Sequence, residues 1–440
     1  MVSLTSVFSR TQTNEQSKLR NVVLSSMIGN MLEWYDFALY GYFSTLLAKL
    51  FFPIKDPVAS LLATYGAFAA GFIMRPLGGV IFGYIGDHVG RKKALLWSIY
   101  LMSFPTFAIG CLPTYAHIGW VAPIMLTTIR LLQGLSMGGE FTGSIVFIVE
   151  HAEGKKRGFF GSFAPFSAVL GLLLGSGIAA LLSFCLSIED LTSWGWRVPF
   201  VLSILGGWLG SYMRRTLGDP ETFEATKQQR KTEDTPKKTF FFKELFQKHR
   251  KSLVTVFLVD LLVAIGFYLI VTFLVGYLEQ FIGLERHTAL LINTLSTVVF
   301  ALSIPLTGIF LDTVGRKPLM LGAAIGFALF GVPLFNMLLS GHIFLILLGA
   351  MGLSALMGIY FAAIPAILVE SFPARVRYSG ISIAHNLSMA IFGGSAPFVV
   401  TWMIPALNTL LAPAFYLTFA SCGALLGLLM LKDRTNENLS

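Results

Sequence analysis

The chain has 440 residues, of which 55% are hydrophobic and 12% are charged, and its formal net charge is +9. Soluble domains carry about 25% charged residues, so this composition excludes an ordinary soluble enzyme. About twenty predominantly apolar residues cross a bilayer as a helix, and only helices and closed barrels satisfy their backbone polar groups in lipid. Because the apolar runs are continuous instead of alternating, we expect an all-α membrane protein.

Twelve apolar stretches of spanning length follow one another along the chain. They cover residues 21–48, 58–85, 93–112, 119–149, 158–183, 197–213, 252–281, 288–311, 318–340, 342–369, 377–404 and 409–431. The first six form an N-terminal half, residues 21–213, and the last six form a C-terminal half, residues 252–431. An N-terminal segment (1–20), a polar central loop (214–251) and a short tail (432–440) complete the predicted organisation.

Basic side chains mark one side of the predicted membrane protein. Lys and Arg gather in residues 1–20, in the loops after the second, fourth, eighth and tenth spans, and in the central loop. The positive-inside rule places these segments in the cytoplasm, so we expect a multi-pass protein with both termini cytoplasmic. The basic charge then requires no nucleic-acid partner.

The sequence contains no motif that indicates a bound metal or cofactor. Cys111, Cys185 and Cys422 lie within or at the ends of apolar runs and lack the spacing of metal ligands. No phosphate-binding loop indicates the use of ATP. We therefore expect no metal, no cofactor and no enzymatic activity.

Two loop motifs occur once in each predicted half. GDHVGRKKA (86–94) follows the second span and LDTVGRKPL (311–319) follows the eighth, so that Asp87 and Arg91 match Asp312 and Arg316. A glutamate also precedes an arginine at one fixed spacing in both halves, as Glu150 before Arg157 and Glu370 before Arg377. Two independent repeats in the same membrane orientation predict parallel halves, related by an axis along the membrane normal.

These motifs resemble the major facilitator superfamily, as does TTIRLLQGLSMGGE in the fourth span. Four further stretches, GNMLEWYDFALYG (29–41), MRPLGG (74–79), WGWRVPF (194–200) and SFPARVRYSG (371–380), resemble its metabolite-proton symporter family. Members of that family carry proline and betaine, 2-oxoglutarate, citrate or shikimate. The resemblance implies a fold of two six-helix halves and uptake driven by a proton gradient across a bacterial inner membrane.

Ionisable residues cluster in the first two spans. Such groups cost about 2.5 to 3.5 kcal/mol each in a bilayer, so they normally face a partner or a water-filled path. Glu33, Asp36 and Tyr40 share one helical stripe of the first span, and Arg75 lies at a similar depth in the second. We expect Glu33 or Asp36 to bind the coupling proton and Arg75 to attract a substrate carboxylate. The alternative is a permanent ion pair that only fixes helix packing.

The fourth span carries a second polar stripe. Arg130, Gln133 and Glu140 fall on one helical face, and the glycines between them permit close helix approach. We therefore count Arg130, Gln133 and Glu140, together with Tyr40, as candidate substrate contacts. Asp260 is the one strong charge deep in the second half. We expect it to lie near the inner end, hydrated by the cytoplasm, with an accessory proton or substrate contact as the alternative.

Aromatic residues are frequent in the first two spans and have two interpretations. They can form a cage for a quaternary ammonium group or simply pack as a core, which is the usual role of aromatic residues in a chain with 39 Phe. The residues concerned are Trp34, Tyr35, Phe37, Tyr40, Tyr65 and Phe68.

The loop motifs suggest a gate at the cytoplasmic side. In the family fold Asp87 and Arg91 would lie near Glu150, where charge-assisted hydrogen bonds can hold the inner side closed. Asp312 and Arg316 would act in the same way, although the case for them is weaker. The alternative is that the basic residues only set the topology.

The sequence thus predicts a symporter of a small carboxylate-bearing solute. A zwitterion such as proline or betaine suits the aromatic spans, whereas two membrane arginines suit an organic acid such as 2-oxoglutarate or citrate. A receptor that binds solute without moving it is the alternative of another class. The osmosensing branch of the family that the chain resembles carries a long cytoplasmic tail, whereas nine residues follow the last predicted span here, so we expect no direct osmosensing.

Overall fold

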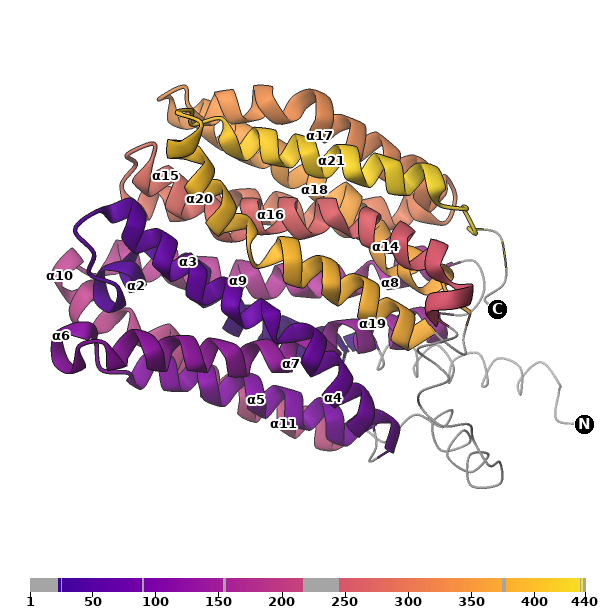
Figure 1. The fold of residues 1–440 in the computed structure, drawn as a ribbon, viewed down its shortest axis with the longest axis horizontal. Helices are drawn as coiled ribbons and strands as arrows, with labels where there is room; N and C mark the ends of the chain where they lie inside the picture. The colour runs from indigo at the N-terminus through magenta and orange to yellow at the C-terminus, as the bar shows by residue number, and fades with distance from the viewer. Residues whose placement is uncertain are drawn as a thin grey trace, which may run out of the picture.

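The computed structural model describes residues 23–24, 26–88, 91–152, 156–216, 245–373, 377–435 and 437. Within these ranges the chain forms twelve long helical stretches that lie side by side in a bundle (Figure 1). Nine helices among the described residues are long and apolar enough to cross a membrane. The predicted fold class, all-α with twelve spans, is confirmed.

The first half contains six of these stretches. They are residues 26–42 with α2 (Ser44–Phe51), α3 (Pro57–Ile73) with α4 (Arg75–His88), α5 (Arg91–Cys111), α7 (Val121–His151), α8 (Arg157–Gly161) with α9 (Phe163–Cys185), and α11 (Arg197–Thr216). Two short helices, α6 (Tyr115–Ile118) and α10 (Ile188–Asp190), and a π-helical turn, Leu191–Gly195, lie between them.

The second half contains the other six. They are α14 (Arg250–Leu262) with α15 (Leu274–Gln280), α16 (Arg286–Leu311), α17 (Arg316–Leu338), α18 (Ile343–Glu370), α19 (Arg377–Ser388) with α20 (Ala396–Ala406), and α21 (Ala412–Met430). π-Helical turns interrupt the first of these stretches at Val263–Phe267 and Leu269–Phe273, and the fifth at Met389–Gly393. Most of the predicted central loop lies outside the described residues.

The glycines of the fourth span allow it to touch the second span backbone to backbone. A Cβ atom added to Gly134 would lie 1.7 Å from the carbonyl oxygen of Gly71, and one added to Gly138 would lie 2.2 Å from that of Arg75. Neither position has room for a side chain, so α7 must pack this closely against α3 and α4. The close approach predicted from these glycines is confirmed.

The two ends of the bundle differ in the motifs that they carry. α8, α14 and α19 begin at one end, whereas α2, α6, α10 and α15 lie at the other (Figure 1). We call the first end, where Glu150, Arg157, Asp312, Arg316 and Glu370 lie, the motif face, and the second end the opposite face. The predicted intramembrane charges lie between the two.

Candidate functional site

Two arginines of the first half are buried in the middle of the bundle. Arg75, at the break between α3 and α4, has 1% of its surface exposed, and Arg130 of α7 has none. Nη1 of Arg75 lies 3.4 Å from the hydroxyl of Tyr268, which stands between the two π-helical turns of the second half. Tyr268 is thus a hydrogen-bond partner of Arg75 that comes from the other half, and the predicted pairing of Arg75 with a carboxylate of the first span stays a prediction.

Arg130 lies among aromatic rings and keeps free donors. Its guanidinium carbon is 4.8 Å from the ring centre of Phe37, 4.6 Å from Tyr40 and 5.0 Å from Phe68. Nη1 donates to Oε1 of Gln133 at 2.6 Å, while Nε and Nη2 are buried without a hydrogen-bond partner among the described residues. Because a buried donor without a partner carries a desolvation penalty, a carboxylate brought to Arg130 would gain strong hydrogen bonds.

A chain of polar groups leads from Arg130 towards Asp36. Gln133, which accepts from Arg130, donates through Nε2 to Oγ1 of Thr106 at 2.7 Å. The carboxylate of Asp36 lies beside the hydroxyls of Thr106 and Ser103, and only 4% of Asp36 is exposed. The structure therefore links a predicted substrate residue to a predicted proton carrier through the third span, which the sequence reasoning had not considered.

Glu33 is also buried, with 4% of its surface exposed, one turn before Asp36. It is one of the charged groups that act on the hydroxyl of Tyr268, together with Arg75 and Arg130. Tyr268 is therefore a meeting point for the predicted charges of the first half. Its own helix gave no such signal in the sequence, because a tyrosine in an apolar run is usually a packing residue.

The aromatic cluster contains four of the six predicted residues. Trp34, Phe37 and Phe68 meet rings of the second half, and Tyr40 packs beside them on Phe68. Ring centres are 5.2 Å apart for Trp34 and Phe267, and 6.1 Å apart for Phe37 and Tyr268. The other two predicted residues point elsewhere: the hydroxyl of Tyr35 donates to the Pro199 carbonyl, and Tyr65 packs on Phe273 near the opposite face.

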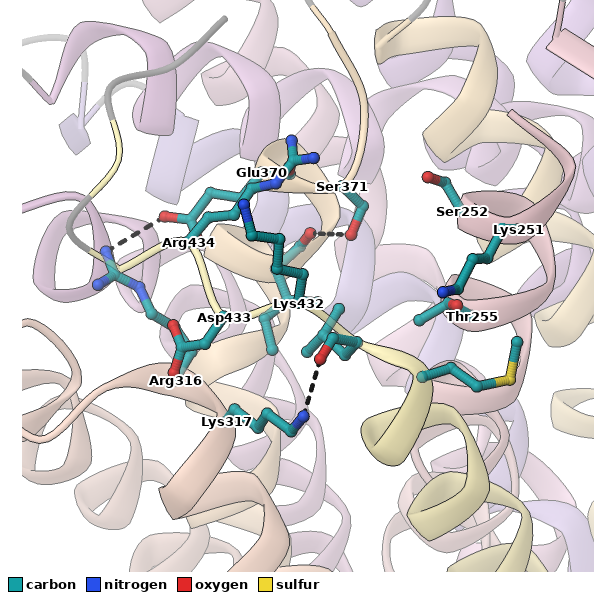
Figure 2. A pocket seen from close by; sticks show the side chains of 13 residues that line it. Lys251, Ser252, Thr255, Arg316, Lys317, Glu370, Ser371, Lys432, Asp433 and Arg434 are labelled. Atoms are coloured by element: carbon teal, nitrogen blue, oxygen red, sulfur yellow. Dashed lines mark hydrogen bonds and ion pairs between the residues drawn. The ribbon is translucent and has the colours of Figure 1, made fainter. Parts of the chain in front are cut away.

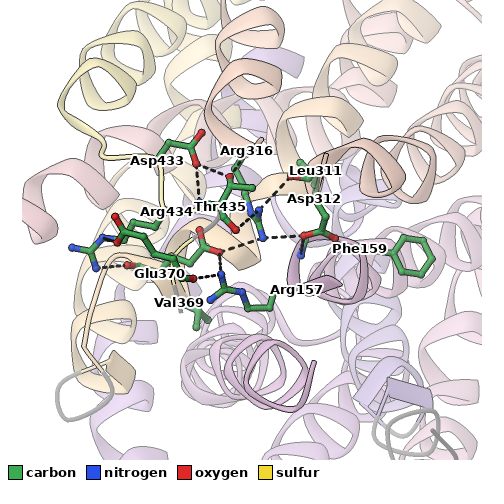
Figure 3. Close-up of polar contacts among 12 residues, drawn as sticks. Arg157, Phe159, Leu311, Asp312, Arg316, Val369, Glu370, Asp433, Arg434 and Thr435 are labelled. Atoms are coloured by element: carbon green, nitrogen blue, oxygen red, sulfur yellow. Dashed lines mark hydrogen bonds and ion pairs between the residues drawn. The ribbon is translucent and has the colours of Figure 1, made fainter. Parts of the chain in front are cut away.

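Ion pairs join the two halves at the motif face. Nη1 of Arg377 lies 2.9 Å from Oε1 of Glu150. Nη2 of Arg157 lies 3.6 Å from Oε1 of Glu370 (Figure 3). In each pair the arginine begins one span and the glutamate ends a span of the other half. The repeat found in the sequence therefore produces the same contact twice, with the roles of the halves exchanged.

Asp312 adds a third link between the halves (Figure 3). Its two carboxylate oxygens accept hydrogen bonds from the backbone N–H groups of Gly158 and Phe159, each at 2.9 Å, at the start of the fifth span. A carboxylate at a helix N-terminus is favoured by the free N–H groups and by the helix dipole. Arg316 holds this carboxylate at 2.9 Å and also reaches Oε1 of Glu370 at 3.3 Å.

At the opposite face one arginine joins the halves. Nη1 of Arg286 donates to Oγ1 of Thr45 at 2.7 Å and lies 3.1 Å from Oε2 of Glu279, while Nη2 donates to the Tyr42 carbonyl at 2.7 Å. Thr45 and Tyr42 belong to the first half, and Arg286 and Glu279 to the second. The sequence analysis did not single out Arg286. Since polar contacts between described residues cross between the halves at both ends, we call this conformation the closed state.

Comparison with known proteins decides the family. The family model described as "Sugar (and other) transporter" matches residues 22–222 and 210–433, which together cover nearly the whole chain. The chain belongs to this family of the major facilitator superfamily. It is a family of transporters and not of enzymes, as the composition and the motifs predicted.

Curated relatives of the transporter are similar over most of their length. The chain is 32% identical to a proline/betaine transporter of Salmonella typhimurium, covering 97% of this chain and 86% of the relative. It is 34% identical to the glycine betaine/proline/ectoine/pipecolic acid transporter OusA of Dickeya dadantii, covering 97% and 85%. A putative proline/betaine transporter of Staphylococcus aureus is 35% identical, with 92% and 87% covered.

Solved structures support the fold of the transporter. The proton:xylose symporter XylE bound to 6-bromo-6-deoxy-D-glucose aligns with a TM-score of 0.79, covering 97% of this chain and 98% of that one. A partially occluded inward-open conformation of XylE from E. coli aligns with a TM-score of 0.76. Both are 18% identical to the transporter, so the similarity concerns the arrangement of the helices.

The transporter also has a pocket at its motif face, within the second half (Figure 2). It has a volume of about 230 Å³ and lies between α14, α17, α18 and the residues that follow α21. Lys251, Arg316 and Lys317 line it together with Glu370, and Nζ of Lys317 donates to the Leu431 carbonyl at 2.8 Å. This pocket is separate from the aromatic centre.

The surroundings of Asp260 in the transporter differ from those that the sequence predicted. We expected hydration from the cytoplasm, but Asp260 has no exposed surface, and its Oδ2 lies 3.0 Å from Nδ1 of His385. The partner is 125 residues away in the chain, so only the packing of α14 against α19 shows it. His385, which the sequence analysis did not single out, is equally buried, with 1% exposed.

Three predicted site residues have side chains outside the described part of the transporter. They are Glu140, a candidate substrate contact, and Asp87 and Arg91, the candidate gate residues of the first half. Their roles stay predictions.

Proposed function

We propose that the chain is a proton-coupled symporter that takes up a small zwitterion, of the proline or betaine type, across a bacterial plasma membrane. The observation that carries the proposal is the centre of the bundle, where two buried arginines lie among aromatic rings from both halves. The names of the curated relatives, proline/betaine transporters at 32% to 35% identity, support the choice of substrate.

Each end of a betaine or proline molecule has a chemical counterpart in this centre. The carboxylate would bind Nε and Nη2 of Arg130, the donors that have no partner in the closed state. The quaternary or secondary ammonium would take cation–π contacts from rings such as Phe37 and Phe68, which now face Arg130 itself. Substrate and Arg130 would thus share one aromatic surface.

Proton coupling would use the polar chain between Arg130 and Asp36. A carboxylate bound at Arg130 and a proton bound at Asp36 would occupy the two ends of one chain that runs through Gln133 and Thr106. Interactions between nearby charges in a buried site are strong, so the binding of one ligand changes the free energy of binding the other. Glu33 is the second candidate for the proton.

Transport would proceed by rocking of the two halves about this centre. By the positive-inside rule the motif face is assigned to the cytoplasm, with both termini on that side. Opening inward would break Arg377–Glu150, Arg157–Glu370 and the contacts of Asp312, while opening outward would break the contacts of Arg286. The energy source would be the proton gradient, without ATP, a bound cofactor or a nucleic acid.

The organic-acid alternative rests on the same two arginines. A dicarboxylate such as 2-oxoglutarate could bind Arg75 and Arg130 together, since both lie in the centre and both act on Tyr268. The receptor alternative would require binding at this centre without movement of the halves. These readings differ in the solute bound and in the presence of flux, so one experiment separates them.

The test is uptake into proteoliposomes with an imposed proton gradient, using labelled proline, betaine, 2-oxoglutarate and citrate. We expect accumulation of proline or betaine that disappears when a protonophore removes the gradient. Accumulation of 2-oxoglutarate or citrate alone would favour the organic-acid alternative. Binding without uptake would favour a receptor, and uptake that ignores the gradient would reject symport.

A further inference from the structure

The pocket at the motif face lies where four spans of the second half end. α14 begins at Arg250 and α17 at Arg316, while α18 ends at Glu370 and α21 ends at Met430. The pocket is enclosed by these helix ends and by the residues that follow α21 (Figure 2). Because membrane spans end in the headgroup region of the bilayer, the pocket lies at the depth of the lipid headgroups. The solute site does not use this space.

The wall of the pocket has more basic than acidic side chains. The basic residues are Lys251, Arg316, Lys317, Lys432 and Arg434, and the acidic residues are Glu370 and Asp433. Both carboxylates already have partners: Oε1 of Glu370 lies 3.3 Å from Nη2 of Arg316, and Oδ1 of Asp433 accepts from the backbone N–H of Thr435 at 3.0 Å. The pocket as a whole therefore favours an anion.

Two lysines of the wall are not paired with an acidic group. Among the residues that the structure describes, Lys251 of α14 forms no ion pair, and Nζ of Lys317 donates only to the neutral Leu431 carbonyl, at 2.8 Å. Lys432 differs from them, because its Nζ lies 2.7 Å from Oε1 of Glu437. An anion in the pocket would therefore be attracted by Lys251 and Lys317 without first breaking an ion pair.

A buried hydroxyl of the wall is also available to a ligand. Thr255 lies one turn after Lys251 on α14, lines the pocket, and has 4% of its surface exposed. Buried threonines elsewhere in the spans, such as Thr106, donate to the carbonyl four residues earlier. Thr255 makes no hydrogen bond to any other described residue. Since residues four apart share one face of a helix, its hydroxyl and the ammonium of Lys251 can serve the same ligand (Figure 2).

Size and donor type limit the chemical class of the ligand. The volume of about 230 Å³ is below the range of about 300 to 1,000 Å³ that is usual for drug-sized ligands, so the pocket suits one anionic group with a small substituent. Lysine binds phosphate as a point charge, and a hydroxyl can donate to a phosphate oxygen. The start of α14 adds the positive end of a helix dipole. These features together favour a phosphate group.

An apolar surface beside the pocket indicates the source of the phosphate. Met430 lines the pocket and is exposed, as are Leu429 beside it and Val254 on α14. A phospholipid whose phosphate enters the pocket can lay its acyl chains along these side chains, whereas a free phosphate gains nothing from them. Basic pockets between membrane spans bind anionic headgroups in this way.

We propose that this pocket binds the phosphate group of an anionic phospholipid from the leaflet at the motif face, with Lys251, Lys317 and Thr255 as its contacts. The bound lipid would join the start of α14 to the residues after α21, because Lys317 already holds the Leu431 carbonyl. All the residues that line the pocket belong to the second half. The proposal therefore depends neither on the solute that is carried nor on its coupling to protons.

Lipid binding to the purified full chain in detergent tests the proposal. Native mass spectrometry counts the bound molecules while short-chain phosphatidylglycerol, or the matching diacylglycerol without a phosphate, is added. We expect phosphatidylglycerol to bind and diacylglycerol not to compete with it. Thr255→Val keeps the size of the side chain and removes the hydroxyl, so it should weaken binding about 3-fold to 10-fold. Lys251→Gln should weaken it about 10-fold or more.

Arg250→Gln is the matched control, because Arg250 is exposed beside Lys251 but does not line the pocket. Equal weakening by Arg250→Gln and Lys251→Gln, with no effect of Thr255→Val, would indicate general attraction to a basic surface and overturn the proposal. If Lys251→Gln does not give folded protein, as judged by its thermal unfolding, Thr255→Val and Lys317→Gln decide: unchanged binding in both rejects the site.

Inorganic phosphate distinguishes the two sources of the ligand. We expect it to displace phosphatidylglycerol only at a large excess, because it lacks acyl chains. Displacement at equal concentration would assign the pocket to phosphate from solution and overturn the lipid assignment. Binding of diacylglycerol as tight as that of phosphatidylglycerol would show that no phosphate is recognised. Since no transported solute is present in these measurements, a failure of the uptake experiment would leave their result unaffected.

Discussion

The motif face and the centre of the bundle are built on different plans. At the motif face the arginine–glutamate contact between the halves occurs twice, as Arg377–Glu150 and Arg157–Glu370. In the centre these groups are not repeated between the halves: Arg130 and Asp36 belong to the first half and Tyr268 to the second. A duplicated contact tolerates the loss of one copy, whereas a single group does not. Substitutions should therefore be graded at the face and severe in the centre.

The largest effect is expected from Asp36→Asn. Loss of the ionisable group should abolish proton-driven accumulation, because no proton can bind at that end of the polar chain. With the membrane potential held at zero, one coupled proton gives about tenfold accumulation for a gradient of about one pH unit, and the variant should only equilibrate. Proteoliposome uptake measures this. Asp190→Asn, at an exposed position, is the control, and unchanged accumulation in Asp36→Asn would exclude Asp36 as the coupling site.

Arg130→Lys should come next. Lysine keeps the charge but loses the planar guanidinium with its free Nε and Nη2 donors. Hydrogen bonds to charged groups contribute about 1.5 to 3 kcal/mol, so the KM for the solute should rise about 10-fold to 100-fold. Arg197→Lys is a matched control, because Arg197 also lies over an aromatic ring, 4.4 Å from the centre of Trp196, but near the opposite face. Equal changes in both variants would contradict a substrate role for Arg130.

A smaller and graded effect is expected at the motif face. Glu150→Gln removes one of the two duplicated contacts and should lower the transport rate a few-fold, since a partly exposed ion pair contributes about 1 kcal/mol or less. Asp312→Asn should cost more, because it weakens both the cap of the fifth span and the contact with Arg316. Initial uptake rates, normalised to the amount of inserted protein, test this order. A lower uptake rate in Glu150→Gln than in Asp312→Asn would contradict the proposal that Asp312 contributes more to the contact between the halves.

The smallest change in rate is expected from Arg286→Gln at the opposite face. Arg286 binds the Tyr42 carbonyl and Thr45, and a neutral amide can keep part of these hydrogen bonds. The conformational equilibrium should shift outward, which accessibility of an introduced cysteine in the opposite-face half of α2 can report. The same substitution at the exposed Arg250 of α14 provides the control. No change in labelling would mean that Arg286 does not hold this end closed.

The fold could be predicted from sequence because its signals are local or repeated. Apolar runs give the spans, and glycines such as Gly134 and Gly138 give their close approach, for which only small residues leave room. The repeated loops indicated that Asp312 and Arg316 share a role with Asp87 and Arg91. The repeat alone did not show that Asp312 joins the two halves, because its hydrogen bonds to Gly158 and Phe159 depend on how the halves meet.

The site was only partly predictable, because its partners come from distant segments. Helical stripes placed Asp36 and Arg130 on inward faces, and both are buried as expected. Tyr268 and the pairing of Asp260 with His385 could not be found in this way, since no periodicity within one helix encodes a partner in another.

The position of Arg316 has a consequence for the cost of opening. It lies on the same half as both carboxylates that it contacts, Asp312 and Glu370. When the halves separate, these carboxylates lose Arg157 and the N–H groups of the fifth span but keep a resident counter-ion. Water then meets a cluster with one net negative charge instead of two unpaired anions, which lowers the barrier and leaves the cluster ready to re-form the same contacts. The contacts among Arg316, Asp312 and Glu370 thus persist within the second half while the two halves are apart.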